Sequence, residues 1–130
     1  MRNVYAIVTT PEIRACCDFY RRALDARIVF RADWYAHISF RGWELGFLKP
    51  HQDAPLPVFQ HTTTTRGLCI ALETENVQAD YEQLLARGLA PLGPMREFAN
   101  GERSFALIDP AGTVLNFVEH RPHAADGPSA

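Results

Sequence analysis

The side chains best suited to take part in a reaction are a histidine and a glutamate on two neighbouring predicted strands. His37 lies in the apolar run 34–40 and Glu44 in the run 43–48, so a hairpin would bring imidazole and carboxylate together. A carboxylate that orients a histidine and stabilises its imidazolium form makes it a general base. The pair is equally compatible with a hydrogen-bonded strand histidine of purely structural role, and both interpretations stay open.

Other motifs of known chemistry are absent from the sequence. It contains no glycine-rich phosphate loop, serine nucleophile elbow, helical zinc-protease motif or dinucleotide fingerprint. Cys16 and Cys17 are adjacent and Cys69 stands alone, which is not the spacing of a disulfide framework. We expect reduced thiols, with Cys16 and Cys17 as small buried side chains.

Composition limits the class of protein and the class of partner. The chain has 130 residues, 47% of them hydrophobic, which suits one compact domain. A net charge of -2 and the lack of Lys or Arg runs argue against nucleic acid or an anionic membrane as partner. Neither a signal peptide nor an apolar run of about 20 residues is present, so we expect a cytoplasmic protein.

The elements that would position these side chains occur twice along the chain. Residues 4–9 form a predicted strand, a helix follows from Thr10-Pro11 to its end at Asp25, and residues 27–31, 34–40 and 43–48 are three further strands. After a region rich in proline and threonine, the order returns with a strand at 68–73 and a helix from Asn76 to Gly88.

Two sequence shifts support a duplication. A shift of 64 aligns residues 4–8 with 68–72, and a shift of 70 aligns 41–48 with 111–118. The fold prediction is therefore α+β, with two tandem βαβββ modules forming a curved mixed sheet. We predict a first module at 1–50, a linker at 51–66, a second module at 67–120 and a tail at 121–130, within one domain.

The chain resembles the vicinal oxygen chelate superfamily, which includes glyoxalases, bleomycin resistance proteins and dioxygenases. The resemblance covers residues 4–120 and rests on Phe19-Tyr20 with Leu24, on residues 81–88, and on Asp109-Pro110-Ala111-Gly112 before the last strand. It implies the glyoxalase/bleomycin resistance fold. Asp25 departs from the glycine usual in the family, so we expect some strain where the first helix ends.

The resemblance also implies four positions for metal ligands, on the first and last strand of each module. They map to Tyr5, Gly46, Cys69 and Asn116, of which only the cysteine is a strong ligand for a divalent first-row metal. We therefore expect no metal and no cofactor. The alternatives are Glu44 as the inward residue in place of Gly46, or a pair of His120 and His123 near the C-terminus.

Strand alternation extends the mapped positions to a concave ligand cup. With regular four-residue turns, Tyr35 lies opposite Gly46, and Phe105 opposite Asn116. The candidate ligand-binding residues are Tyr5, Tyr35, His37, Glu44, Gly46, Cys69, Arg103, Phe105 and Asn116. The aromatic members are expected to stack on a planar ligand, although core packing is the alternative for each of them.

The resemblance and this cup lead to two hypotheses of function. The first is a metal-free binding protein that sequesters an aromatic or antibiotic-like small molecule, as bleomycin resistance proteins do. The second is a lyase, isomerase or dioxygenase-type enzyme of the same superfamily, which uses His37, Glu44 or Glu73 in acid-base chemistry or holds a metal elsewhere. The resemblance also implies a symmetric homodimer.

Overall fold

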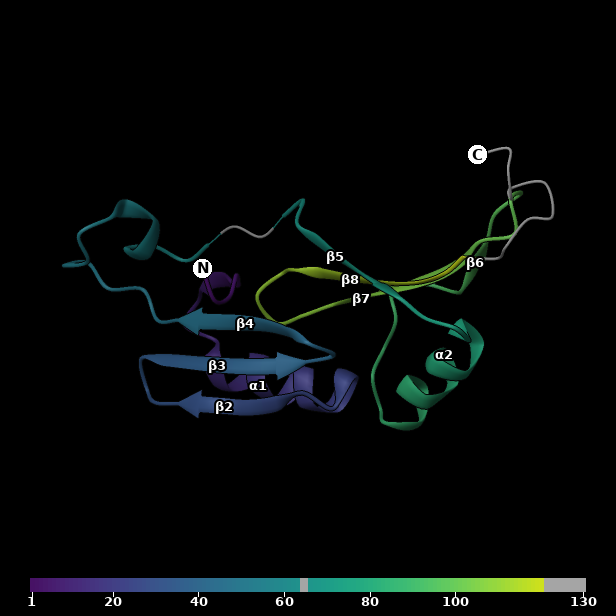
Figure 1. Ribbon diagram of the computed structural model, residues 1–130, viewed down its shortest axis with the longest axis horizontal. Coiled ribbons are helices and arrows are strands. Elements are labelled where there is room, and N and C mark those ends of the chain that lie inside the picture. Colours follow the sequence, from purple (N-terminus) through teal and green to yellow (C-terminus); the bar gives the residue numbers. More distant parts are fainter. Residues whose placement is uncertain (64–65, 121–130) are drawn as a thin grey trace. The chain divides into compact units, whose positions relative to one another are not determined.

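Each half of the chain folds as a βαβββ module around one four-stranded mixed sheet (Figure 1). The computed structural model describes residues 1–63 and 66–120. The sheets have the strand orders β1-β4-β3-β2 and β5-β8-β7-β6, with the first and last strand of each module as parallel neighbours. The predicted α+β class and two-module architecture are confirmed.

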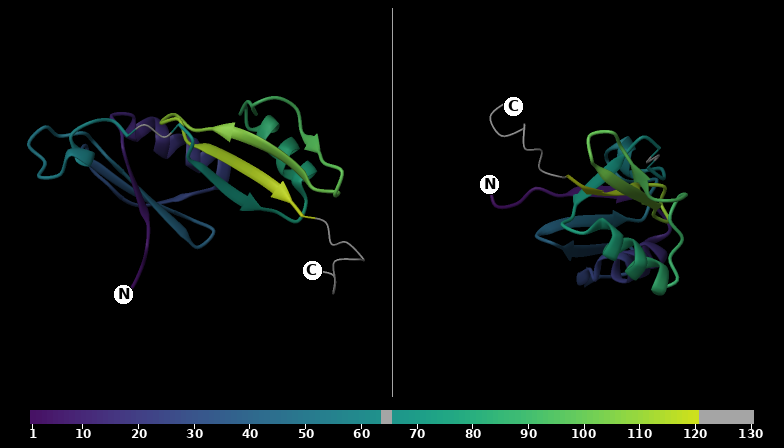
Figure 2. Two further views of the ribbon diagram at one scale, coloured as in Figure 1. Left: turned by 90° about the horizontal axis from the view of Figure 1, so that it is seen from above. Right: turned by 90° about the vertical axis from the view of Figure 1, so that its right-hand side faces the viewer.

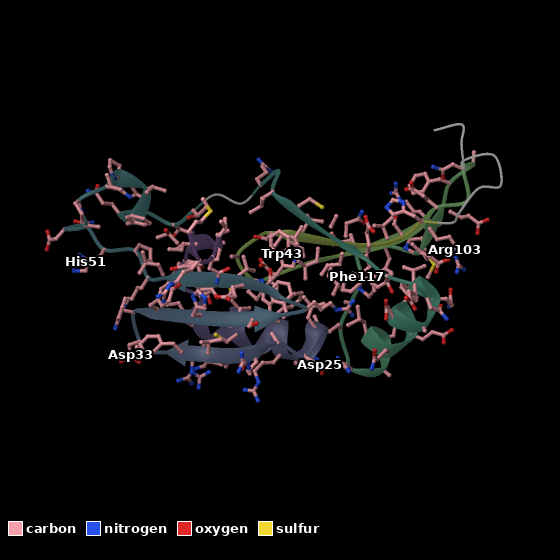
Figure 3. All side chains as sticks on the ribbon, viewed as in Figure 1. Asp25, Asp33, Trp43, His51, Arg103 and Phe117 are labelled. Atoms are coloured by element: carbon pink, nitrogen blue, oxygen red, sulfur yellow. The ribbon has the colours of Figure 1, made fainter. Side chains whose placement is uncertain are left out.

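The chain divides into two compact units, which are described separately. The first unit comprises residues 1–68 together with 109–113, and the second comprises residues 69–108 and those from 114 onward. The elements of the first unit are β1 (Ala6–Thr9), α1 (Ile13–Leu24), β2 (Arg27–Arg31), β3 (Tyr35–Phe40) and β4 (Trp43–Leu48). Figure 3 labels Asp33 and Trp43, which precede β3 and begin β4 at opposite ends of this sheet.

Helix α1 forms because its apolar residues recur on one face, and that face packs on β3 and β4. Cys16, Cys17 and Tyr20 on this face are fully buried, so the prediction of buried cysteines is confirmed. Asp25 ends the helix in the left-handed conformation with φ of 53°, where the resemblance led us to expect strain.

The second unit contains β5 (Cys69–Glu73), α2 (Val77–Ala86), β6 (Arg96–Glu97), β7 (Arg103–Ile108) and β8 (Val114–Glu119), which Figure 2 shows from two further sides. The Asn76 side chain caps α2 by accepting a hydrogen bond from the backbone N–H of Ala79 at 3.0 Å. Gly88, with φ of 81°, follows the end of the helix, as predicted.

The turn between β7 and β8 belongs to the first unit and is built around a buried carboxylate. Asp109 is 4% exposed, and its Oδ1 accepts hydrogen bonds from the backbone N–H groups of Ala111 and Thr113, both at 2.9 Å. The Tyr20 hydroxyl donates to Asp109 Oδ2 at 2.7 Å. The aspartate of the Asp109–Gly112 motif thus joins the turn to α1.

The segment after β4 carries a short 3-10 helix, η1 (Pro57–Phe59). Its backbone returns to strand β1, where the Thr9 N–H donates to Thr63 Oγ1 at 2.8 Å and the Thr9 hydroxyl donates to the Val58 carbonyl at 3.2 Å. Within residues 1–63 and 66–120, no helix has the length and apolar character needed to cross a bilayer.

Candidate functional site

The candidate site lies on the face of the first sheet that α1 does not cover. Along β3, Ala36, Ile38 and Phe40 are buried toward the helix, whereas the alternate residues Tyr35 and His37 are only half-buried. Strand β4 has the matching pattern, with Leu45 and Phe47 buried in the core. The predicted assignment of residues to the two faces therefore agrees with the structure in this hairpin.

The pairing of individual residues differs from the prediction. The hairpin has a two-residue turn, Arg41-Gly42, whose φ values of 50° and 82° are those of a primed β-turn. Gly46 consequently lies opposite His37 rather than opposite Tyr35. The displacement is two residues, and since side chains alternate with a period of two, the faces stay correct while the partners change.

A chain of hydrogen bonds joins the polar residues of this open face. The Tyr35 hydroxyl is 2.7 Å from His37 Nδ1, and His37 Nε2 is 2.5 Å from Glu44 Oε1. The amide of Asn3 donates to Glu44 Oε2 at 2.7 Å. Because a carboxylate only accepts, His37 Nε2 carries a proton, and in the neutral ring Nδ1 accepts from the Tyr35 hydroxyl. We call Asn3, Tyr35, His37 and Glu44 the relay.

The pKa values of the two acidic side chains in the relay are shifted in opposite directions. The hydrogen bond from His37 lowers the pKa of Glu44, and the one from Asn3 adds to this effect. Removal from solvent raises the pKa of the Tyr35 phenol, and the neighbouring Tyr5 and Glu44 raise it further. At neutral pH the relay therefore holds an ionised Glu44 and a protonated Tyr35, whose hydroxyl is hydrogen-bonded to His37 Nδ1.

Aromatic side chains surround the relay and form a pocket. Phe30, Trp34 and Tyr35 contact one another with ring centroids 5.7 to 6.4 Å apart, and Tyr5 meets the His37 ring edge-on at 4.6 Å. The cavity that they border measures about 600 Å³. Its lining consists of Tyr5, Ile7, Val29, Phe30, Trp34, Tyr35, His37, Glu44, Leu48 and Phe59.

Sequence reasoning missed three of these aromatic residues, Phe30, Trp34 and Phe59, and the amide of Asn3 that joins the relay. Phe30 reaches the open face because the pairing of β2 with β3 slips between Ile28 and Phe30, so that Phe30 lies opposite His37. A bulge of this kind changes which face a side chain occupies and leaves no reliable mark in sequence alternation. Trp34, Phe59 and Asn3 lie outside the strands, where alternation gives no direction.

In the second unit, the prediction that Phe105 faces the open side was wrong. Phe105 is 3% exposed, pairs with Phe117 across the two strands, and stacks on its ring at 4.7 Å with an interplanar angle of 4°. The ring of Tyr81 in α2 meets the Phe105 ring edge-on, with centroids 5.1 Å apart. Phe105 is therefore a core residue between the sheet and α2, the alternative that was left open for it.

The error has a simple geometric cause. In the first hairpin, two residues separate the paired residues Phe40 and Trp43. In the second hairpin, three residues separate Asp109 from Thr113, and the Asp109 N–H donates to the Thr113 carbonyl at 2.8 Å. A single additional residue reverses the parity of β7 relative to β3. The position equivalent to Tyr35 is consequently Ser104, which pairs with Val118 as Tyr35 pairs with Leu48.

The remaining predicted site residues of the second unit have separate environments. Arg103 pairs with Glu119, its guanidinium 3.2 Å from Glu119 Oε1, and the same oxygen accepts from the backbone N–H of Val77 at the start of α2. Cys69 is exposed at the start of β5. Asn116 borders a second cavity of about 410 Å³ with Arg96 and Phe98.

The residues at the mapped metal positions do not fit a metal centre. Gly46 offers no donor, and a side chain placed there would collide with Tyr35, whose Cζ lies 2.8 Å from the position of a Cβ. Tyr5 and Asn116 are weak ligands for first-row metals, and the described part of the chain holds no group of three or more His, Cys, Asp or Glu side chains that could bind a metal ion. His120 lies 3.1 Å from Glu102, and His123 is outside the described residues.

Comparison with known proteins identifies the family. The Glyoxalase/Bleomycin resistance protein/Dioxygenase superfamily matches residues 3–117, and a search of curated proteins found no match. A glyoxalase/bleomycin resistance protein/dioxygenase from Nocardioides has a TM-score of 0.77 at 18% identity, covering 98% of this chain and 89% of that one.

Two further solved structures have the same fold and are named for different functions. A lactoylglutathione lyase from Agrobacterium tumefaciens has a TM-score of 0.70 at 16% identity, with 92% of this chain and 94% of that chain covered. A bleomycin-binding protein in complex with bleomycin has a TM-score of 0.62 at 19% identity, with coverage of 93% and 100%. Both sheets, the repeated order of elements and the match over residues 3–117 agree: the chain belongs to the Glyoxalase/Bleomycin resistance protein/Dioxygenase superfamily.

Proposed function

We propose that this protein is a metal-free member of its superfamily that binds and sequesters a small planar aromatic or antibiotic-like compound in the pocket of its first unit. The observation that carries the proposal is the pocket of about 600 Å³, walled by Phe30, Trp34 and Tyr35 with the relay at its polar end. A largely apolar cavity with a few fixed polar groups is typical of small-molecule sites. A relative of the same fold is a bleomycin-binding protein, which agrees with a binding role.

A thermal-shift screen of aromatic metabolites and antibiotics tests the proposal, followed by calorimetric titration of each hit. Trp34→Ala should weaken binding by about 1 to 3 kcal/mol, the range for a buried aromatic contact. Trp43→Ala is the matched control, because Trp43 is also exposed but does not border the pocket. Equal losses in both variants, or none in either, would contradict a site in this pocket. Mass spectrometry of the ligand recovered after incubation distinguishes sequestration, which leaves it unchanged, from turnover.

The absence of a metal is part of the proposal and has its own test. Gly46 and Asn116 at two of the four mapped positions supply no strong ligand. Elemental analysis of protein purified without an affinity tag should find no stoichiometric transition metal. About one equivalent of zinc, nickel, manganese or iron per chain would contradict the mapping.

The relay itself supports a second candidate function, an enzyme that moves a proton. As a bound compound gives a proton to the Tyr35 oxygen, the phenol proton can move to His37 Nδ1, and Glu44 stabilises the resulting imidazolium. Tyr35→Phe keeps the ring and removes the proton. A compound that is converted by the native protein but only bound by Tyr35→Phe would support this alternative.

Assembly and location complete the proposal. We propose a symmetric homodimer in the cytoplasm, on the strength of the family resemblance and of the free thiols of Cys16, Cys17 and Cys69. Analytical ultracentrifugation tests the assembly, and a monomer at micromolar concentration would contradict it.

A further inference from the structure

We infer that the pocket of the first unit selects an aromatic organic cation over a neutral or anionic compound of the same shape. This inference rests on the proposed function and specifies its ligand class. Glu44 is the one carboxylate among the lining residues, which include no Lys or Arg. The hydrogen bonds from His37 and Asn3 keep it ionised by lowering its pKa.

Most donors of the relay are already hydrogen-bonded within it, whereas the Glu44 carboxylate keeps free acceptor positions for a ligand. The Tyr35 O–H, the His37 Nε2–H and one Asn3 N–H are directed to partners within the relay. Glu44 accepts one bond at each oxygen, and each oxygen has a further lone pair. A ligand with a positively charged or proton-donating group satisfies these acceptors, whereas an anion faces the carboxylate directly.

The walls of the pocket favour the same charge. The faces of aromatic rings carry negative potential, and a cation within about 6 Å of a ring centroid is attracted to it. Phe30, Trp34 and Tyr35 form one contiguous aromatic surface, with Tyr5 beside His37. Aromatic rings and a carboxylate in one cavity are suited to a planar compound that bears a delocalised or quaternary positive charge.

Three probes of nearly the same shape test the inference: the cation N-methylquinolinium, the neutral 1-methylnaphthalene and the anion 1-naphthoate. Equilibrium dialysis against the full chain gives the affinity for each. We expect the cation to bind about tenfold more tightly than the neutral hydrocarbon, and the anion to bind most weakly. Glu44→Gln should remove most of that tenfold preference, measured as the ratio of the affinities for N-methylquinolinium and 1-methylnaphthalene.

The control variant is Glu75→Gln, which removes the same charge from an exposed residue of the second unit. It should leave all three affinities unchanged. Equal affinity for cation and hydrocarbon, or a preference that survives Glu44→Gln, would overturn the inference while the aromatic pocket stands. If none of the three probes binds, the proposed function itself is contradicted. The two failures are therefore distinguishable.

Discussion

The Tyr35 phenol lies over Gly46 and occupies the space that any side chain at that position would need. A Cβ on Gly46 would come within 2.8 Å of Tyr35 Cζ, closer than non-bonded carbon atoms approach. Tyr35 is held there by its hydrogen bond to His37. Because glycine has no side chain, Tyr35 can lie over Gly46 and reach His37, and the same close approach leaves no room for a metal-binding side chain at this position.

Gly46→Ala should push the Tyr35 ring away from His37 and damage the site. We expect a stability loss of about 1 to 3 kcal/mol, as for other insertions of a methyl group into a packed position. Calorimetric titration should show weakened ligand binding as well. In the background of Tyr35→Ala the same substitution should cost far less, because the obstructing ring is gone. A cost that is equal in the two backgrounds would show that Tyr35 is not the obstacle.

Phe105→Ala should behave as a core substitution. The ring stacks on Phe117 and contacts Tyr81, so its removal should lower the free energy of unfolding by about 3 to 5 kcal/mol, as Phe117→Ala should. Trp34→Ala, an exposed residue, should cost much less stability. Chemical denaturation of the three variants measures the difference. A loss for Phe105→Ala as small as for Trp34→Ala would contradict the core assignment.

The elements could be predicted because each carries a local signal. The apolar face of α1, the cap at Asn76 and the glycine at Gly88 are visible in the sequence, and β2 and β4 occupy the predicted residues. The two shifts of the repeat agree with the sheets, since Ile7 pairs with Gly46 as Ala71 pairs with Asn116. The fold followed from periodicity and duplication together.

The site could be predicted only in part, because it depends on the lengths of turns and on a bulge. The open face of β3 and β4 was correct since the error in the turn was even. The predicted length of the turn after Asp109 was wrong by one residue, which placed Phe105 on the wrong face of the sheet. The bulge before Phe30 could not be predicted, so Phe30 was not recognised as a lining residue of the pocket. Turn length changes by one residue without any change in apolar pattern, so alternation alone cannot detect it.

The thiols should differ sharply in reactivity. Burial is the largest cause that raises the pKa of Cys16, to about 12, with Asp109 adding to it, and burial likewise raises the pKa of Cys17 although Arg31 opposes it. Cys69 is exposed. Ellman's reagent at about pH 8 should therefore modify one thiol rapidly and the other two only after unfolding. Cys69→Ser should abolish the rapid reaction, and a rapid signal that persists would contradict the burial of α1.

Binding of a cationic ligand should persist to low pH. The pKa of Glu44 is lowered from 4.5 by His37 and Asn3, with a smaller contribution from Arg27. Because this pKa is lowered, Glu44 is fully ionised at pH values above the ordinary carboxyl pKa, and its charge is lost only as the pH falls through the lowered pKa. As far as Glu44 governs it, affinity for N-methylquinolinium should hold down to the ordinary carboxyl pKa of 4.5 and decline only as the pH falls below that value. In Glu44→Gln this decline should vanish, and its persistence would assign it to another group.

Tyr20→Phe should destabilise the protein by removing the hydrogen-bond donor to one oxygen of a buried carboxylate. The Tyr20 hydroxyl donates to Asp109 Oδ2 at 2.7 Å, and Asp109 is 4% exposed, so water cannot easily replace the lost donor. We expect a loss of about 1 to 3 kcal/mol, the range for a buried acceptor left without a partner.

The matched control for that substitution is Tyr81→Phe in α2. Its hydroxyl has no hydrogen-bond partner among residues 1–63 and 66–120, so its removal should change stability by less than about 0.5 kcal/mol. Urea denaturation of both variants measures the contrast. Asp109→Asn in the Tyr20→Phe background should recover part of the loss, because a neutral amide is less costly to bury than a carboxylate without its donor. Equal stability of Tyr20→Phe and the native chain would mean that the bond between α1 and the Asp109 turn contributes nothing to folding.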